Sequence, residues 1–182
     1  MTDEKRIVDI MKMGVVCKTH RPVMSLQKYK YSFKGQDAVN FLVSSGTVGT
    51  EEEAVRVGDR LLELELIARL TGKGVFLSDN SLYRFVKKLT KDEAFRYATE
   101  MSKKILEKDR KYRMSTYKNC FTGSEFVDTF VASHKVDRNE ATQTGNAILA
   151  LRAIVQIRGD KDFEDETTSF YRFKLVCANF RD

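Results

Sequence analysis

The chain has 182 residues, of which 42% are hydrophobic and 32% charged, and its formal net charge is +6. This balance is ordinary for a soluble globular protein, and no apolar run approaches the ~20 residues that cross a bilayer. The first residues lack the apolar stretch of a signal peptide, the second residue is not glycine, and no prenylation box ends the chain. With only three cysteines, these features predict a cytoplasmic protein with free thiols.

The first part of the chain predicts two helices separated by an arm, and then a longer helix. Apolar residues at helical spacing predict a helix over residues 3–17. An irregular β-hairpin arm is expected over residues 23–32, where basic and aromatic residues interleave, and a short apolar helix over residues 35–44. Thr50 and Glu53 have the spacing of a capping box, which predicts that the longest helix begins there.

A small sheet is expected to follow the longest helix. Residues 67–70 and 75–77 flank a Gly-Lys-Gly turn and predict a hairpin, and residues 82–86 predict its closing strand. Thr90 and Glu93 form a second predicted capping box. The helix that starts there is expected to run to about residue 111 and to join the two halves of the chain as a semi-rigid connection.

The second half predicts the same order of elements. They are an arm over residues 112–119, a core helix capped by Thr122 with Glu125, a long helix capped by Asp137 with Glu140, strands at 154–157 and 169–173, and an acidic turn at 160–166.

Two sequence matches between the halves of the chain agree with this repetition. Residues 33–43, FKGQDAVNFLV, return as residues 121–131, FTGSEFVDTFV, and the YRF at 83–85 returns at 171–173. Ordered matches at a nearly constant spacing indicate one fold used twice. Gly58 and its counterpart Gly145 both lie inside a predicted helix, where glycine costs roughly 1 kcal/mol relative to alanine. We therefore expect close helix packing at both positions.

The predicted fold class is α+β. We expect two winged-helix-like domains, at residues 1–88 and 89–182, joined by a helix at about 90–111. Each domain is expected to be a three-helix bundle with a β-hairpin arm and a small C-terminal β-hairpin. The start at Met1 and the abrupt end at Asp182 lead us to expect an N-terminal part of a larger protein.

The excess positive charge gathers at the front of each repeat. Residues 1–34 hold eight Lys or Arg against three Asp or Glu, and residues 103–118 hold seven against two. The distribution predicts a basic surface made by corresponding parts of the two copies, while a pair of merely solvated lysine-rich helices is the alternative.

No pattern of residues indicates catalysis or a metal. Cys17 and His20 are spaced like one half of a zinc site, but the chain lacks a second matching pair. The turn at 72–74 lacks the spacing of a phosphate-binding loop, and the acidic turn at 160–166 lacks that of a calcium-binding loop. Neither histidine belongs to a recognisable triad. We therefore predict no catalytic residue, no metal ligand and no cofactor.

Three features of each repeat resemble the DEP domain family. They are the Phe-x-Gly-x-x-x-Val-Asn/Asp stretch, the Glu-Ala near the start of the long helix, and the closing Tyr-Arg-Phe. The resemblance covers nearly the whole chain, twice over. One departure concerns the tryptophan that usually follows the Asp of the core helix, because Phe41 and Thr129 stand in its place. Phenylalanine can fill the same pocket and threonine cannot, so the second repeat is expected to pack differently there.

The resemblance implies a non-enzymatic signalling module that recruits or regulates its host protein at membranes, with peripheral membrane association. The implied partners are an acidic phospholipid surface, such as one containing phosphatidic acid, and/or a membrane-bound signalling protein such as a receptor tail, a kinase or a G-protein regulator. In the family the arm after the first helix makes this contact, with an apolar tip flanked by bases. The implied lipid- or partner-binding residues here are Arg21, Met24, Leu26, Lys28, Lys30, Arg110, Lys111, Tyr112, Arg113, Met114 and Lys118.

Two other functions fit a basic winged helix. Nucleic-acid binding would place the third helix in the major groove, but in the first repeat that helix is rich in acidic residues, which repel phosphate. A purely protein-binding regulatory module is the other alternative. It predicts recruitment that depends on one membrane protein and survives the removal of acidic lipid.

Overall fold

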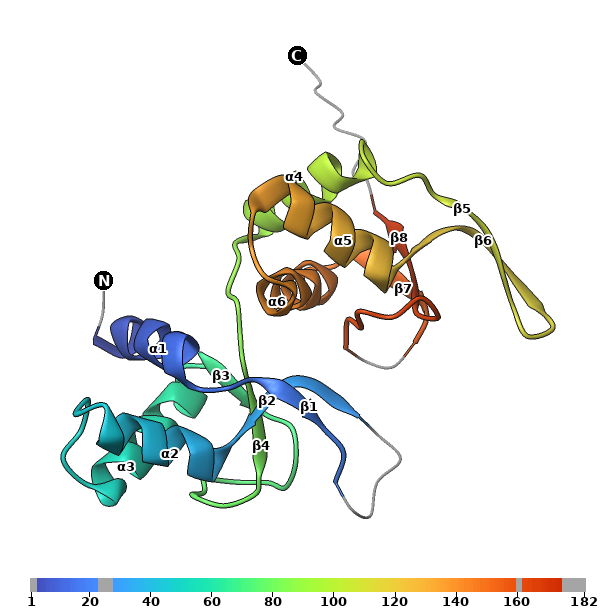
Figure 1. Ribbon diagram of the computed structural model, residues 1–182. Coiled ribbons are helices and arrows are strands. Elements are labelled where there is room, and N and C mark those ends of the chain that lie inside the picture. The colour runs from blue at the N-terminus through green and yellow to red at the C-terminus, as the bar shows by residue number, and fades with distance from the viewer. Residues whose placement is uncertain (1–2, 23–27, 160–161, 175–182) are drawn as a thin grey trace. The chain divides into compact units, whose positions relative to one another are not determined.

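The computed structural model describes residues 3–22, 28–159 and 162–174. The chain divides into two compact units, Met1–Val86 and Lys87–Asp182, which are named unit 1 and unit 2. Within the described residues each unit has three helices and one four-stranded antiparallel sheet (Figure 1). The α+β class with two winged-helix-like units is therefore confirmed.

The elements follow one another in the same order in both units. Those of unit 1 are α1 Asp3–Gly14, β1 Lys18–His20, β2 Tyr29–Lys34, α2 Gly35–Ser44, α3 Glu51–Glu63, β3 Ile67–Arg69 and β4 Leu82–Phe85. Those of unit 2 are α4 Lys91–Ser102, β5 Lys108–Tyr112, β6 Ser115–Thr122, α5 Gly123–His134, α6 Arg138–Ala150, β7 Ile154–Arg158 and β8 Phe170–Phe173.

The second strand of each unit belongs to both the arm and the core. The strand orders are β1-β2-β4-β3 and β5-β6-β8-β7, so the arm strand lies at one edge and the second strand reaches into the body. Phe33 is in register with Tyr83, and Phe121 with Tyr171. All four side chains are fully buried. Each arm is therefore anchored by the aromatic core of its own unit.

The first helix of each unit is shorter than predicted. In unit 1 it ends at Gly14, and in unit 2 at Ser102 and not near Lys111. The prediction for unit 2 was wrong because residues 108–112 form β5, which bonds to β6. Ile105 keeps its place in the core after the helix has ended, so its apolar character did not require helical backbone.

The predicted hairpin around the Gly-Lys-Gly turn is also wrong. β3 pairs directly with β4, and residues 75–77 form no strand. The guanidinium of Arg69 donates hydrogen bonds to the carbonyl oxygens of Thr71, Lys73 and Val75. These bonds occupy the backbone acceptors of the loop, which therefore needs no strand partner.

Helix caps follow the sequence pattern closely. Thr90 and Thr122 each form a full capping box, and the side chain of Asp137 accepts from Glu140 N. Thr50 accepts from Glu53 N, but the Glu53 carboxylate accepts from Gly49 N at 2.8 Å. Of the capping box predicted at Thr50, only the hydrogen bond from Glu53 N to the Thr50 side chain is therefore present, because the Glu53 carboxylate bonds to Gly49 N instead of Thr50 N.

The two mid-helix glycines face aromatic rings. A Cβ at Gly58 would overlap the Phe76 ring, and one at Gly145 would overlap the Phe163 ring. Both rings come from the loop between the last two strands of their unit. A tight approach was predicted correctly, but the partner is a ring from this loop and not another helix.

The missing tryptophan is replaced differently in the two units. Phe41 packs partly buried against the core of unit 1, and a Cβ at Gly14 would overlap its ring. In unit 2, Thr129 leaves this place without a ring, and Lys104 donates hydrogen bonds to Ser133 and Glu100. The end of the first helix in unit 2 thus has a polar contact in addition to the core packing of Met101 and Ile105.

Candidate functional site

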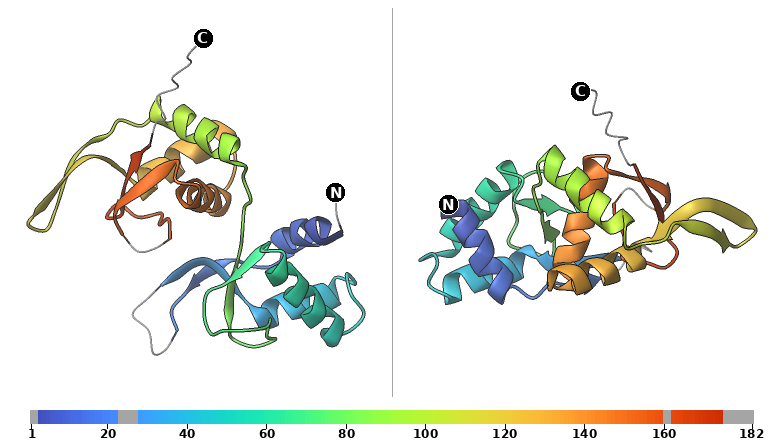
Figure 2. Two further views of the ribbon diagram at one scale, coloured as in Figure 1. Left: turned by 180° about the vertical axis from the view of Figure 1, so that it is seen from behind. Right: turned by 90° about the horizontal axis from the view of Figure 1, so that it is seen from above.

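The arm of unit 2 is a two-stranded ribbon that extends away from the helices of its unit (Figures 1 and 2). Tyr112 pairs with Ser115, so only Arg113 and Met114 form the turn. Arg113 has a φ of 53°, which few non-glycine residues adopt. Met114 is 103% exposed. The outermost point of the arm is therefore an apolar side chain beside a base.

The register divides the arm into two faces, because side chains alternate along a strand. Lys111 pairs with Thr116, and Lys118 lies two residues further on the same face. These three residues are exposed. They form the outward face of the arm, which carries positive charge and no aromatic residue.

The opposite face of the arm contacts the small sheet. The rings of Tyr112 and Tyr117 meet Phe170 edge-on, with centroids 6.5 and 5.1 Å apart. The guanidinium of Arg158 lies 3.6 Å from the centroid of the Tyr112 ring. Contacts of this cation–π type contribute about 0.5–1 kcal/mol at exposed sites, so the aromatic face orients the arm on the body of unit 2.

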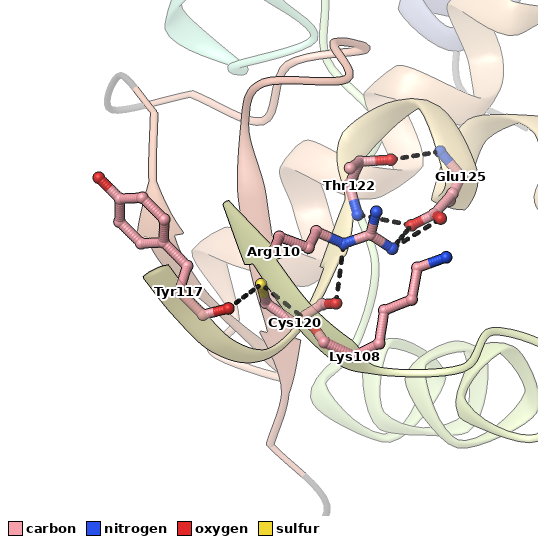
Figure 3. Close-up of polar contacts among 6 residues, drawn as sticks. All are labelled: Lys108, Arg110, Tyr117, Cys120, Thr122 and Glu125. Carbon is pink, nitrogen blue, oxygen red and sulfur yellow. Dashed lines mark hydrogen bonds and ion pairs between the residues drawn. The ribbon is translucent and has the colours of Figure 1, made fainter. Parts of the chain in front are cut away.

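Arg110 fixes the base of this arm (Figure 3). Its Nη2 pairs with both carboxylate oxygens of Glu125, one of them at 2.6 Å, and its Nε donates to the Cys120 carbonyl at 3.1 Å. Glu125 also accepts from Thr122 N at 2.9 Å. One carboxylate thus joins the arm to the first turn of α5.

The electrostatics of Glu125 agree with this role. Burial acts to raise the pKa of its carboxyl group, but the hydrogen bonds from Thr122 and Arg110 outweigh burial and lower that pKa below its ordinary value. The carboxylate therefore stays ionised and paired at neutral pH.

Cys120 completes the base of the arm as a buried thiol. Its Sγ lies 3.5 Å from the Tyr117 carbonyl oxygen and 3.7 Å from that of Lys108 (Figure 3). Burial raises the pKa of this thiol, which keeps it protonated. A protonated, buried thiol is a poor nucleophile and metal ligand.

The six predicted contact residues of unit 2 thus fall into two groups. Lys111, Arg113, Met114 and Lys118 are exposed on the outer arm. Tyr112 is half-buried against Phe170 and Arg158, and Arg110 has 15% of its side chain exposed within its ion pair. The structure therefore brings four of the six together on the solvent side of the arm.

In the arm of unit 1, the described strands β1 and β2 pair as β5 and β6 do in unit 2, with different residues. Arg21 and Lys28 are exposed, and Lys30 is half-buried. The predicted apolar tip residues, Met24 and Leu26, lie outside the described residues. At the base, Nδ1 of His20 lies 2.8 Å from Oγ of Ser32, at the register position that Arg110 and Cys120 occupy in unit 2.

His20 has an unusual environment. Its Nε2 is buried and is without a hydrogen-bond partner among the residues that the structure describes. Burial, followed by the charges of Lys18 and Lys34, lowers the pKa of the imidazole, which Asp37 raises only in part. The ring is therefore held in its neutral form.

Sequence reasoning missed the body residues that hold the arm. Arg158 and Phe170 lie more than 40 positions after Tyr112 in the chain, and no local pattern links them to it. Glu125 was predicted only as half of a helix cap. The ion pair with Arg110 became visible only once the strand register was known.

The described part of the chain contains neither a metal-binding group of residues nor a membrane-spanning helix. No group of three or more His, Cys, Asp or Glu residues there could hold a metal ion. No described helix is long and apolar enough to cross a membrane.

Comparisons with known proteins agree with the repeated fold. The family described as "Domain found in Dishevelled, Egl-10, and Pleckstrin (DEP)" matches the chain twice, at residues 14–85 and 104–173. Two solved structures are similar: the DEP domain of mouse pleckstrin2, at 25% identity over 48% of this chain and 84% of that one (TM-score 0.42), and the human pleckstrin DEP domain, at 18% identity over 46% and 100% (TM-score 0.38).

Two curated relatives are much longer than this chain. The mouse phosphatidylinositol 3,4,5-trisphosphate-dependent Rac exchanger 1 protein is 28% identical over 78% of this chain and 9% of its own length. The human phosphatidylinositol 3,4,5-trisphosphate-dependent Rac exchanger 2 protein is 26% identical over 81% of this chain and 10% of its own length. The chain thus spans about a tenth of each relative.

DEP domains are non-catalytic modules that act in signalling and membrane targeting. Each family match runs from about the end of the first helix of its unit to the end of its last strand. The chain therefore belongs to the DEP domain family and carries two copies of the domain in tandem.

Proposed function

We propose that this tandem module recruits its host protein to membranes that contain anionic phospholipid, with the arm of unit 2 as the principal contact. The observation that carries the proposal is the exposed outer arm, in which Met114 lies at the tip beside Arg113. Lys111 and Lys118 stand behind the tip on the outward face. An apolar tip followed by bases suits a leaflet whose headgroups are negative and whose interior is apolar.

The expected affinity is modest. Each base near an anionic leaflet contributes about 1 kcal/mol, and burying the Met114 side chain adds about 1.5–3 kcal/mol. Three bases and the tip together give about 5 kcal/mol, which corresponds to a Kd on the order of 0.1–1 mM. Binding through this arm alone would be reversible.

We include the arm of unit 1 as a second contact, through its exposed Arg21 and Lys28 and through Met24 and Leu26, which the sequence predicts at its tip. A second contact made by the same chain strengthens binding wherever both arms can engage one surface. Lys30 belongs to this proposed set, although its half-buried position favours a smaller contribution. In unit 2, Arg110 and Tyr112 serve the contact indirectly, because they hold the arm in place.

The host protein is proposed to be a larger signalling protein of the kind represented by the two Rac exchangers. The names of both relatives include dependence on phosphatidylinositol 3,4,5-trisphosphate, which is itself an anionic lipid. This lipid is therefore a suitable probe beside phosphatidic acid and phosphatidylserine.

Nucleic-acid binding is disfavoured by the contacts of two polar side chains in α6, the third helix of unit 2, which would be the helix that enters the major groove. Arg138 pairs with Asp128 and Asp165. The side chain of Asn146 donates to the Thr142 carbonyl and accepts from Phe163 N. Both side chains are already engaged within their own unit.

Co-sedimentation of the 182-residue chain with vesicles tests the proposal. The arm variant carries K111Q, R113Q, M114S and K118Q. The matched control carries K91Q, K103Q and K135Q, which remove the same charge from exposed positions of unit 2 outside the arm. We expect salt-sensitive binding to anionic vesicles that falls at least tenfold in the arm variant and much less in the control. Equal losses would reject the arm, and no binding to any vesicle would favour a membrane protein as the partner.

A further inference from the structure

Thr116 lies in the middle of the basic outward face of the arm. It pairs across the ribbon with Lys111, so their Cβ atoms are about 4.5–5.5 Å apart. Lys118 follows two residues later on the same face. The Thr116 side chain is exposed, and no hydrogen bond of the described structure uses its hydroxyl group. Any chemical change at this hydroxyl would therefore act directly on the charges of the arm.

The sequence around Thr116 has the charge pattern that basic-directed protein kinases select. Lys111 and Arg113 lie five and three residues before Thr116, and Lys118 lies two residues after it. No Asp or Glu occurs between Asp109 and Glu125. A kinase with acidic residues along its substrate groove would attract this segment and meet no like charge in it.

The fold also gives a kinase access to the segment. Thr116 lies only two residues beyond Met114 in the turn, and the outer pairs of the ribbon belong to two strands without a third neighbour. Isolated two-stranded ribbons are only marginally stable. Opening the outer pairs so that the segment can enter a kinase groove therefore requires no rearrangement of the core.

We propose that Thr116 is a phosphorylation site for a basic-directed serine/threonine kinase, and that the phosphate acts as an electrostatic switch on the arm. The γ-phosphoryl group of ATP would be transferred to Oγ1 of Thr116. The new O–P bond replaces the bond to the bridging oxygen of ADP, and the hydroxyl proton passes to the kinase base and then to solvent.

The consequence for the arm follows from charge. A phosphothreonine carries about −1.5 to −2 charges at neutral pH, against the three positive charges of Lys111, Arg113 and Lys118. The outer arm would keep only about one net positive charge. This part of the proposal rests on the proposed membrane function, since each lost charge weakens binding to an anionic leaflet by roughly fivefold.

Neighbouring Ser115 is a less suitable acceptor. It pairs with Tyr112 on the opposite face, where the tyrosine packs against Phe170 and Arg158. The basic residue three positions before the acceptor is Arg113 for Thr116, whereas Tyr112 holds that position for Ser115. The register therefore favours Thr116 over Ser115.

The first experiment locates the phosphate. The 182-residue chain is incubated with Mg²⁺, ATP and the catalytic subunit of a cyclic-AMP-dependent protein kinase, and phosphopeptides are mapped by mass spectrometry. We expect phosphate on Thr116, none there in Thr116→Val, and slower transfer in Arg113→Gln than in Arg113→Lys. Phosphate on other residues only, or no transfer, would overturn the assignment.

The second experiment measures the switch on vesicles of phosphatidylcholine with phosphatidic acid. We expect phosphorylation to weaken binding about tenfold or more, while Thr116→Val binds like the unmodified chain before and after kinase treatment. Equal binding of the phosphorylated and unmodified chains would overturn the switch. Failure of the unmodified chain to bind would overturn the membrane function and the switch with it, whereas the site assignment is judged by the mapping alone.

Discussion

The described strands of the two arms pair in the same order, but the arms are held at their bases by different chemistry. In unit 2 an arginine joins the arm to a helix carboxylate, with Arg110 paired to Glu125. In unit 1 the corresponding residue is His20, which meets the hydroxyl of Ser32, and its Nε2 is buried without a partner among the described residues. The base of the arm is thus held by an ion pair in unit 2 and by a neutral hydrogen bond in unit 1.

Shared features show what the fold itself requires. Both arms have a residue with positive φ where the second strand leaves the ribbon, Tyr31 at 53° and Asn119 at 47°. Both second strands end in a buried phenylalanine that pairs with a buried tyrosine. The residue with positive φ and the aromatic anchor are thus common to both copies, whereas the base contact differs and can give each arm its own stability.

The largest expected effect concerns an anchor that both units share. A Cβ at Gly35 would overlap the Leu77 carbonyl oxygen, and one at Gly123 would overlap that of Glu164. Because a backbone atom cannot move aside cheaply, Gly35→Ala and Gly123→Ala should each destabilise their own unit by about 3 kcal/mol. Urea unfolding combined with hydrogen exchange would measure this for each unit.

Gly49→Ala is the matched control, since the nearest atom to its Cβ is the flexible Glu53 carboxylate at 3.3 Å. A change below about 0.5 kcal/mol is expected there. If only one of the two buried-glycine variants were destabilised, the loop after the third strand would not play the same part in both units.

The next effect separates the two arm bases. Arg110→Ala leaves the Glu125 carboxylate without its cation and should destabilise the base of the unit 2 arm by about 2 kcal/mol. His20→Ala removes one neutral hydrogen bond and should cost the unit 1 arm about 1 kcal/mol. Amide exchange along β6 and β2 would report each loss locally. Equal losses would show that the ion pair has no special role.

The smallest effect is a difference in pH dependence. The folded state lowers the pKa of His20 from its ordinary value near 6.5, so the unfolded chain takes up the proton first as the pH falls. The contribution of His20 to the free energy of unfolding of unit 1 should therefore be fully present above pH 6.5. It should decrease as the pH falls below 6.5. His20→Gln should remove this part of the dependence.

Unit 2 should respond at a lower pH. Its carboxylate at Glu125 has a lowered pKa, so its contribution is complete above the ordinary value of 4.5 and is lost only as the pH falls below it. Thermal unfolding of both units between pH 7.5 and 5.5 tests the contrast. A decrease in the thermal stability of unit 2 that begins near pH 6.5 would contradict this contrast.

The sequence predicted most of the fold because the repeat and the local signals agree. The match of residues 33–43 with 121–131 placed the core helices, and the threonines at 90 and 122 predicted their capping boxes. The end of the first helix in unit 2 was not predictable in this way. Ile105 continues the helical apolar pattern, although it reaches the core from the turn that follows the helix.

The candidate site was predictable only as a basic, apolar-tipped segment. Which bases are free depends on strand register and on partners distant in sequence. Lys111 and Arg110 are neighbours in the chain, yet one is exposed on the outward face and the other is paired with Glu125. The packing of Tyr112 against Phe170 and Arg158 likewise depends on contacts across the sheet.

The most direct test of membrane docking places a fluorophore at the tip of the unit 2 arm. The chain has no tryptophan, so Met114→Trp introduces a single one, and Leu106→Trp provides a control at an exposed position before β5. With phosphatidic acid vesicles we expect a blue-shifted emission and quenching by brominated lipid for Met114→Trp only, and no change with neutral vesicles. Emission from position 114 that stays unchanged with every vesicle would contradict docking through this arm.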